Sequence, residues 1–176
     1  MDSFEVLAFY RGISSAKMLT HPAIHKTPKN RAPLNTPHKN HQLADNWFEN
    51  RFGTRYRSQA VFATSSLTTA SFYAKYESVE LHPAPAIVRI IPLGPYKYCW
   101  SPRISDLVFS LKDPDLGSEV GDILDRAGYC EQNLRNAYES GHEVMIHCEE
   151  YISIPIALLK PQETEESKGA LIIVDK

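Results

Sequence analysis

Runs of strand-forming residues, spread over the whole chain, place the strongest limit on its fold. Before residue 100 these runs alternate with segments of helical spacing, whereas after residue 143 they follow one another without a helix between them. A doubly wound parallel sheet needs a helix after each strand, so this order favours an α+β domain. The predicted strands are 4–12, 59–66, 86–94, 143–148 continuing into 151–159, and 170–174.

Segments with the apolar spacing of helices lie between these strands. The predicted helices are 13–20, 41–53, 67–76 and 121–139. Gly53 follows the second of them as a C-cap, because glycine readily adopts the left-handed conformation that ends a helix. The 67–76 helix begins with hydroxyl residues, which suit a helix N-terminus. Gly128 is the position at which the last helix would divide.

The length of 176 residues allows one domain with a substantial core, so we expect a single domain over 1–176. A basic segment rich in Pro, His and Lys covers 21–41. Its four prolines exclude a long helix, and it is predicted to be a loop. The polar segment 161–169 is predicted to be a second loop.

Composition and charge exclude some classes of protein. Apolar residues make up 43% of the chain and charged residues 23%, with a formal net charge of −2, which predicts no bulk attraction to nucleic acid or membranes. The charge is uneven, because basic residues dominate from Lys17 to Arg57 while the segment after Asp106 is acidic. No signal sequence is recognisable, and no apolar run approaches the roughly 20 residues of a spanning helix. We therefore expect a cytoplasmic protein, in the producing or the host cell, without membrane contact.

The cysteines and histidines lack the grouping of a metal site. Three cysteines cannot all pair in one chain and none has ligand spacing, so we expect them to be reduced. Two histidine pairs in the basic segment have a spacing that a metal could use, but no cysteine or carboxylate cluster accompanies them. The sequence therefore predicts a polar loop without a bound metal. The residues concerned are Cys99, Cys130, Cys148, His21, His25, His38 and His41.

Three short motifs stand at the ends of predicted strands. Arg11 lies at the end of the first strand, the hydroxyl run Thr64-Ser65-Ser66 at the end of the second, and Glu143 at the start of a later one. Singly, these residues suit a surface cation, helix N-caps and a solvated strand end. Together, in this order and spacing, they resemble the ADP-ribosyltransferase family, in its toxin-type branch with an Arg, Ser-Thr-Ser, Glu pattern. The matching stretches are FYRG, VFATSSLTTASFYA, AIVRIIPLG and GHEVMIH, between about Tyr10 and Ile154.

The resemblance implies two packed, mostly antiparallel sheets with flanking helices and an NAD cleft between them. NAD would be a substrate whose bond between nicotinamide and ribose is broken. Glu143 would be the catalytic residue, holding the ribose 2′-hydroxyl and stabilising the positive charge that develops as this bond breaks. Arg11 would clamp the pyrophosphate or ribose side of NAD, and Gly12 would leave the backbone open to the nicotinamide amide. A glycine-rich phosphate loop of the Rossmann or P-loop kind is absent from the sequence.

The hydroxyl run and the helix after it complete the implied NAD site. Thr64, Ser65 and Ser66 would bind the nicotinamide ribose and orient the catalytic carboxylate. Thr64 replaces the first serine of the family pattern but keeps its hydroxyl. Tyr73 or Phe72 would stack on the nicotinamide ring.

Gly141, two positions before Glu143, bears on the acceptor. Arginine-modifying members of the family have a second glutamate there and others have glutamine, so transfer to a protein arginine is disfavoured. The resemblance implies a nucleic acid or a non-arginine protein site as acceptor, and the basic region from Lys17 to Arg57 would contact RNA or DNA. Such a protein would be a toxin or a phage host-takeover factor, with an antitoxin or inhibitor protein as a further partner.

A second resemblance leaves other functions open. The middle and later stretches, including PLGPYKYCWSPRISDL, are similar to small phage-encoded proteins of unassigned role. One alternative is a catalytically inactive phage virion or interaction protein that retains the fold. Another is a nucleic-acid-binding module that uses the basic face from Lys17 to Arg57.

Overall fold

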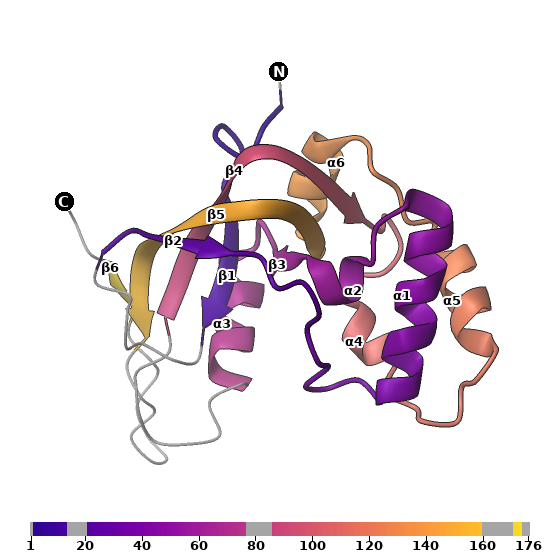
Figure 1. The fold of residues 1–176 in the computed structure, drawn as a ribbon. Helices are drawn as coiled ribbons and strands as arrows, with labels where there is room; N and C mark the ends of the chain where they lie inside the picture. Colours follow the sequence, from indigo (N-terminus) through magenta and orange to yellow (C-terminus); the bar gives the residue numbers. More distant parts are fainter. Residues whose placement is uncertain (1, 14–20, 77–85, 160–170, 174–176) are drawn as a thin grey trace, which may run out of the picture.

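The computed structural model describes residues 2–13, 21–76, 86–159 and 171–173. Within these residues the chain is an α+β structure, in which an antiparallel sheet is flanked by helices (Figure 1). The fold class predicted from the order of strands and helices is therefore confirmed. The elements are β1 (Phe9–Ile13), β2 (Ala23–Lys26), α1 (His38–Phe52), α2 (Tyr56–Gln59), β3 (Val61–Ala63), α3 (Leu67–Tyr76), β4 (Ala86–Trp100), α4 (Leu107–Ser110), α5 (Glu119–Ala127), α6 (Leu134–Ser140), β5 (Val144–Leu159) and β6 (Leu171–Ile173).

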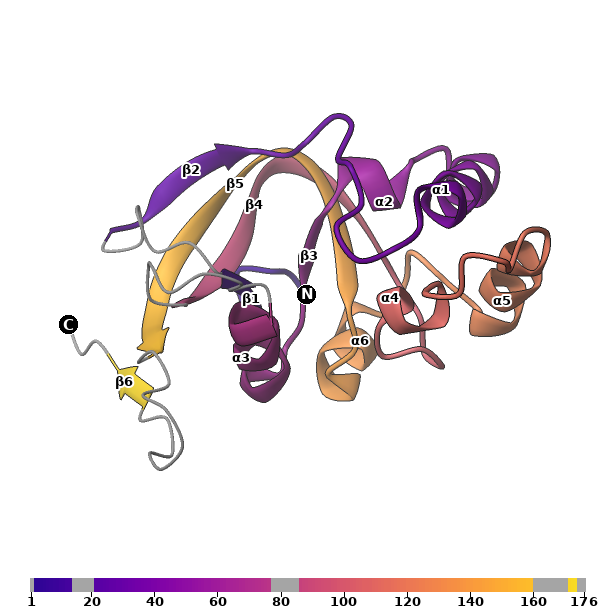
Figure 2. The ribbon, with the colours of Figure 1, turned by 90° about the horizontal axis from the view of Figure 1, so that it is seen from below.

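Two long strands, β4 and β5, form the centre of the sheet. The described strands have the order β1-β4-β5-β2, while β3 and β6 pair with the two ends of β5. Both long strands arch across the molecule (Figure 2). The register between them shifts after Leu93, where Gly94 has a φ of 70° that favours glycine. The separate second sheet expected from the sequence is not confirmed, because β4 and β5 join all the described strands into one sheet.

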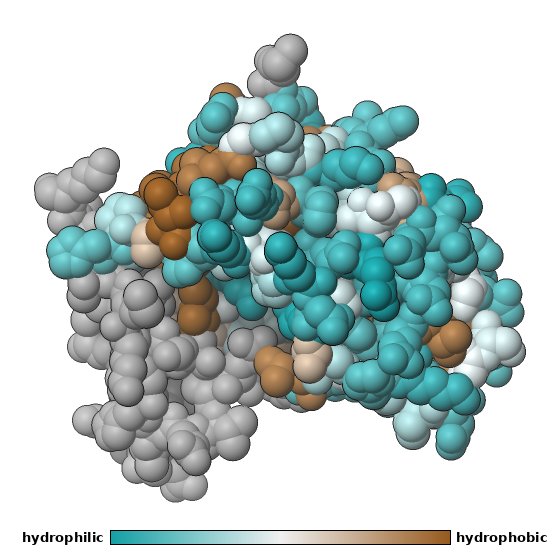
Figure 3. All heavy atoms as spheres, in the orientation of Figure 1, coloured by the Kyte–Doolittle hydropathy of each residue, from teal (hydrophilic) through white to brown (hydrophobic). Residues whose placement is uncertain are grey.

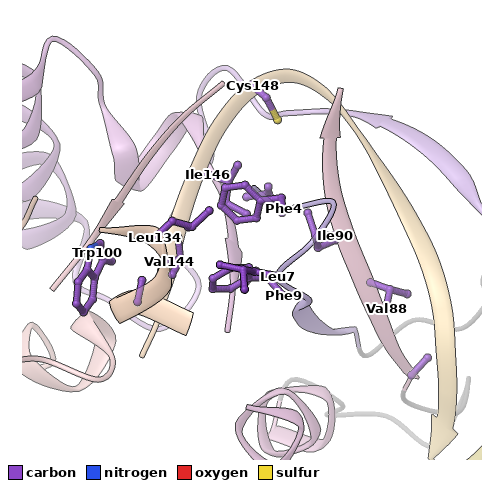
Figure 4. Close-up of a cluster of buried hydrophobic side chains, with 14 residues drawn as sticks. Phe4, Leu7, Phe9, Val88, Ile90, Trp100, Leu134, Val144, Ile146 and Cys148 are labelled. Atoms are coloured by element: carbon purple, nitrogen blue, oxygen red, sulfur yellow. The ribbon is translucent and has the colours of Figure 1, made fainter. Parts of the chain in front are cut away.

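Alternation along β5 lets the strand contribute to two cores. Val144 and Ile146 pack with Phe4 and Phe9 in a cluster between β1, β4 and β5 (Figure 4). Met145, which points to the other face, packs in a second cluster with residues of α1, α4 and α5. Both faces of the start of β5 are thus covered, and this fixes the position of the residue that precedes it.

Several predicted elements are confirmed. Helix α3 has the predicted bounds, and Gly53 ends α1 in the left-handed conformation with a φ of 68°. Gly128, with a φ of 66°, ends α5 and separates it from α6. Among the described residues, none of the helices is long and apolar enough to span a membrane.

Other predictions were wrong in their bounds. The first strand begins at Phe9 and not at residue 4, because the N–H groups of Val6 and Leu7 donate to the carbonyl of Ser3 and form a turn. The predicted loop 21–41 contains β2, and its end belongs to α1. The predicted strand in which 143–148 continues into 151–159 is observed as one strand, β5, which begins one residue later, at Val144. The predicted helix at 13–20, apart from Ile13 in β1, and the loop at 161–169 lie outside the described residues.

Candidate active site

A cavity of about 130 Å³ brings together most of the residues singled out in the sequence. It lies among β1, β3, α3, the loop between β2 and α1, and α4. Five predicted site residues line it: Arg11, Gly12, Thr64, Tyr73 and Glu143. Phe72, the alternative to Tyr73, is not among the described lining residues. The motifs therefore meet at one place although they are far apart in the sequence.

Strand pairing explains this convergence. The backbones of Tyr10 and Thr64 exchange hydrogen bonds of 2.7 and 2.8 Å, which places Arg11 next to the hydroxyl run. Antiparallel pairing of β3 with β5 sets Ala63 opposite Val144. The residues that follow Ala63 and precede Val144 are therefore neighbours, and these are Thr64 and Glu143.

The hydroxyl run joins the segment between β3 and α3 to the end of α6. Thr64 Oγ1 donates to the carbonyl of Gly141 at 2.6 Å, and Ser65 Oγ donates to the carbonyl of Tyr138. Ser66 Oγ accepts from the N–H of Thr69 at 3.2 Å in the first turn of α3. Ser65 and Ser66 do not line the cavity within the part of the chain that the structure describes, so their contacts are those of positioning residues.

Two glycines near the cavity have backbone roles. A Cβ on Gly12 would overlap the carbonyl oxygen of Ala70 and the backbone nitrogen of Ala74, so β1 can pack this closely on α3 only with glycine. Gly141 ends α6 with a φ of 70°, a conformation that other residues adopt with strain.

Glu143 lies in a partly enclosed and positively charged setting. Its side chain is 14% exposed and accepts a long contact of 3.5 Å from Arg57 Nη1, while its backbone N–H donates to Ser105 at 2.9 Å. Burial raises the pKa of the Glu143 carboxyl to about 7, although the charge of Arg57 opposes this rise. Near neutral pH the carboxyl can therefore both hold and release a proton.

Three arginines gather around the ring and backbone of Phe62. Arg11 Nη1 donates to the Phe62 carbonyl at 3.2 Å. The guanidinium carbons of Arg31 and Arg57 lie 4.3 and 4.8 Å from the centre of the Phe62 ring. Burial, together with the positive charges of Arg11 and Arg57, lowers the pKa of Arg31 to about 10.

The cavity carries an excess of positive charge. Its cationic lining residues are Arg11, Arg31, Arg57 and Lys112. Among the described residues that line it, Glu143 is the one carboxylate. A site with this balance attracts anions such as phosphate groups. No sequence motif included Arg31, Arg57 or Lys112, and the basic run from Lys17 to Arg57 was the one signal that covered two of them.

The buried carboxylate of Asp45 fixes the position of Arg57. Asp45 Oδ1 accepts from the backbone N–H groups of Arg57 and Ser58 at 2.9 and 3.1 Å, and Oδ2 accepts from the Ser58 hydroxyl. His41 Nε2 lies 3.5 Å from the same carboxylate. Asp45 is fully buried, so these contacts are shielded from water and hold α2 in place.

Two histidines of the basic segment, His25 and His41, contact other side chains of the protein. His25 Nε2 bonds to Ser153 Oγ at 2.7 Å and its ring stacks on Tyr151, whereas His41 lies against Asp45. In the described part of the chain, no group of three or more His, Cys, Asp or Glu could hold a metal ion.

Comparisons with models of protein families, with curated proteins and with solved structures each found no match. The case for a function therefore rests on the residues of the cavity.

Proposed function

We propose that the protein is an NAD-dependent mono-ADP-ribosyltransferase with an ADP-ribosyltransferase-like fold, acting as a toxin or host-takeover factor. The observation that carries this proposal is that Arg11, Thr64 and Glu143, brought in by three different strands, line one cavity. Each of these residues alone has an ordinary structural role. A chance gathering of all three around one cavity, next to further arginines, is a poor alternative explanation.

The proposed reaction breaks the bond between ribose C1′ and the nicotinamide nitrogen. The electron pair of this bond leaves with nicotinamide, which becomes neutral, and positive charge develops on the ribose. Ionised Glu143 stabilises this charge and accepts a hydrogen bond from the ribose 2′-hydroxyl. A nucleophile of the acceptor then bonds to C1′, and its proton passes to Glu143 and on to solvent. A carboxyl with a pKa of about 7 suits both steps.

The NAD phosphates and the nicotinamide ring have candidate partners on one wall of the cavity. Arg11 supplies a planar donor fork for the pyrophosphate, since arginine binds phosphate oxygens in pairs. Tyr73 of α3 offers an aromatic surface for the nicotinamide ring. Thr64 connects this wall to the segment before Glu143 through its hydrogen bond to the carbonyl of Gly141.

The test is nicotinamide release from NAD by the purified protein, measured by chromatography, together with transfer of labelled ADP-ribose to RNA, DNA and lysate proteins. Glu143→Gln should lower the rate of release by about 100-fold or more, the usual effect of removing one transition-state contact. Glu149→Gln changes an exposed carboxylate of β5, the strand that follows Glu143, and should behave as wild type. If neither wild type nor Glu143→Gln releases nicotinamide or transfers label, the proposal is wrong and an interaction protein without activity is favoured.

A further inference from the structure

The cavity has a second wall that the proposed NAD contacts do not use. Residues proposed for NAD come from β1, β3 and α3, whereas the other cations come from the loop before α1, from α2 and from the residues after α4. Both views of the ribbon place β1 and α3 to one side of β3, and α2 and α4 to the other (Figures 1 and 2). The second wall carries Arg31, Arg57 and Lys112.

Arg57 has hydrogen-bonding capacity that the described residues do not fill. The residue is 3% exposed, and its Nε has no hydrogen-bond partner among the residues that the structure describes. Its contact with Glu143 is long, at 3.5 Å. A buried guanidinium with unmet donors is costly, and an anion in the cavity would remove that cost. Arg57 is therefore independent support for an anion site on this wall.

Exposed apolar side chains stand beside these cations. The loop between β2 and α1 carries a small hydrophobic group on a mainly hydrophilic surface (Figure 3), and Leu34 in this loop is 82% exposed. Phe109 of α4 is 52% exposed, and the ammonium of Lys112 lies 4.4 Å from the centre of its ring. Leu34 and Phe109 both line the cavity.

This combination fits a single-stranded nucleic acid better than a phosphorylated peptide. Sites for single strands join cations that contact the phosphates with aromatic and apolar faces that contact the bases. Lys26 at the end of β2 and Lys29 in the loop that supplies Arg31 are both exposed, and a nucleic-acid chain can continue along them. A phosphopeptide would use the cations but has no general need of the apolar pair.

We infer that this wall binds a single-stranded nucleic-acid acceptor, with Arg31, Arg57 and Lys112 on a phosphate and Leu34 and Phe109 against the adjacent base. The role as acceptor rests on the proposed function, whereas the binding itself does not. Binding places the nucleic acid next to Glu143, where its nucleophile can reach ribose C1′. The nucleophile need not be the contacted phosphate.

Binding is tested with the full chain and a fluorescent single-stranded RNA or DNA 12-mer, by polarisation in the absence of NAD and over a range of salt. Lys112→Gln should weaken binding and lower the slope of log affinity against log salt by about 0.7, the value for one phosphate contact on a single strand. Phe109→Ala should weaken binding between about fivefold and a hundredfold through lost stacking. Arg126→Gln, an exposed arginine on α5, is the matched control and should bind as wild type.

Replacement of Arg31 by lysine removes the paired guanidinium donors but keeps the positive charge. Arg31→Lys should weaken binding with little change in the salt slope, because the charge stays while the paired donors are lost. Thermal melting of each variant shows that it is folded.

Three results would overturn the inference. One is equal binding by Lys112→Gln, Phe109→Ala and Arg126→Gln. Another is displacement of the oligonucleotide from wild type by saturating NAD, which would assign these cations to NAD. The third is competition by a phosphoserine peptide of equal charge as strong as by unlabelled oligonucleotide, which would indicate a protein acceptor. Oligonucleotide binding without nicotinamide release would reject the transferase proposal alone and leave a nucleic-acid-binding site.

Discussion

Replacement of Asp45 by alanine tests whether one buried carboxylate organises the second wall of the cavity, which carries Arg31, Arg57 and Lys112. Asp45 accepts three hydrogen bonds, two from the backbone N–H groups of Arg57 and Ser58 and one from the Ser58 hydroxyl. The carboxylate is fully buried, so water does not readily replace it. In Asp45→Ala the N–H of Arg57 loses its acceptor, whereas the N–H of Ser58 keeps the carbonyl of Arg55 at 3.1 Å and the Ser58 hydroxyl keeps its contact with His41 Nε2 at 3.2 Å. Asp45→Asn keeps an oxygen for the two N–H groups and loses the charge.

The expected cost follows from these contacts. The buried N–H of Arg57 left without a partner costs about 1–3 kcal/mol, and the loss of each of the two Ser58 hydrogen bonds costs about 1 kcal/mol. We therefore expect Asp45→Ala to lower the free energy of unfolding by about 3–5 kcal/mol, which is also the usual cost of removing one partner from a buried charged network. For a chain of this length, 1 kcal/mol lowers Tm by about 2–4 °C, so Tm should fall by at least about 6 °C. Asp45→Asn should cost about 1–2 kcal/mol.

Urea unfolding followed by circular dichroism measures this cost, with thermal melting as a second measurement. Asp115→Ala removes an exposed aspartate from the loop between α4 and α5 and should change the free energy of unfolding by no more than about 0.5 kcal/mol. The reasoning is refuted if Asp45→Ala and Asp115→Ala are equally stable. It is also refuted if Asp45→Asn is as unstable as Asp45→Ala, because the two N–H bonds would then contribute nothing.

Other predictions concern the charge of Glu143 and the two glycines. Burial raises the Glu143 pKa from 4.5 to about 7, so the folded state keeps a proton that the unfolded state loses. The free energy of unfolding of wild type should therefore fall, relative to Glu143→Gln, as pH rises from about 4.5 to about 7, as checked by urea titrations across this range. Nicotinamide release should rise through the same region, with its midpoint near pH 7, and Arg57→Gln should move that midpoint upward because a neighbouring positive charge is lost. A flat pH profile would contradict both expectations. Gly12→Ala should lower the free energy of unfolding by about 1–3 kcal/mol through overlap with α3, measured by urea unfolding, and a neutral result would show that α3 can move. Gly141→Ala should cost about 1 kcal/mol and Gly141→Asn less, because asparagine tolerates the left-handed conformation, and equal melting temperatures would refute the strain.

The fold class was predictable because it depends on local patterns, whereas the cavity residues Arg11, Thr64 and Glu143 were singled out by a resemblance to a family pattern. Runs of strand-forming apolar residues indicated the strands, and Gly53 and Gly128 indicated where helices end. The bounds of the first strand were not predictable, because the turn at Ser3 has the same apolar composition as a strand. The long strand from 143 to 159 was predictable, whereas its pairing with β4 is a long-range contact that no local pattern indicates.

The residues of the second wall of the cavity could not be predicted from the sequence, for a different physical reason. Arg57 is held in place because Asp45 of α1 binds the backbone of α2, and this contact joins residues of two helices that show no common sequence pattern. Lys112 follows a short helix, 81 residues after Arg31 along the chain, and meets the cavity only through tertiary packing. A count of basic residues identifies a charged region but does not separate the cations that line a cavity from those in solvent.

The structure also changes the interpretation of Gly141 as an indication of the acceptor. Gly141 ends α6 in the left-handed conformation, and its carbonyl accepts from Thr64 at 2.6 Å. Glycine is therefore explained by the backbone of the turn that precedes Glu143, whatever the acceptor is. A glutamate there would strain this turn as well as add a carboxylate, so Gly141→Glu could fail to modify arginine for structural reasons alone. The class of acceptor must instead be tested on the wild-type cavity, where Arg31, Arg57 and Lys112 would repel the guanidinium of an arginine substrate and attract a phosphate.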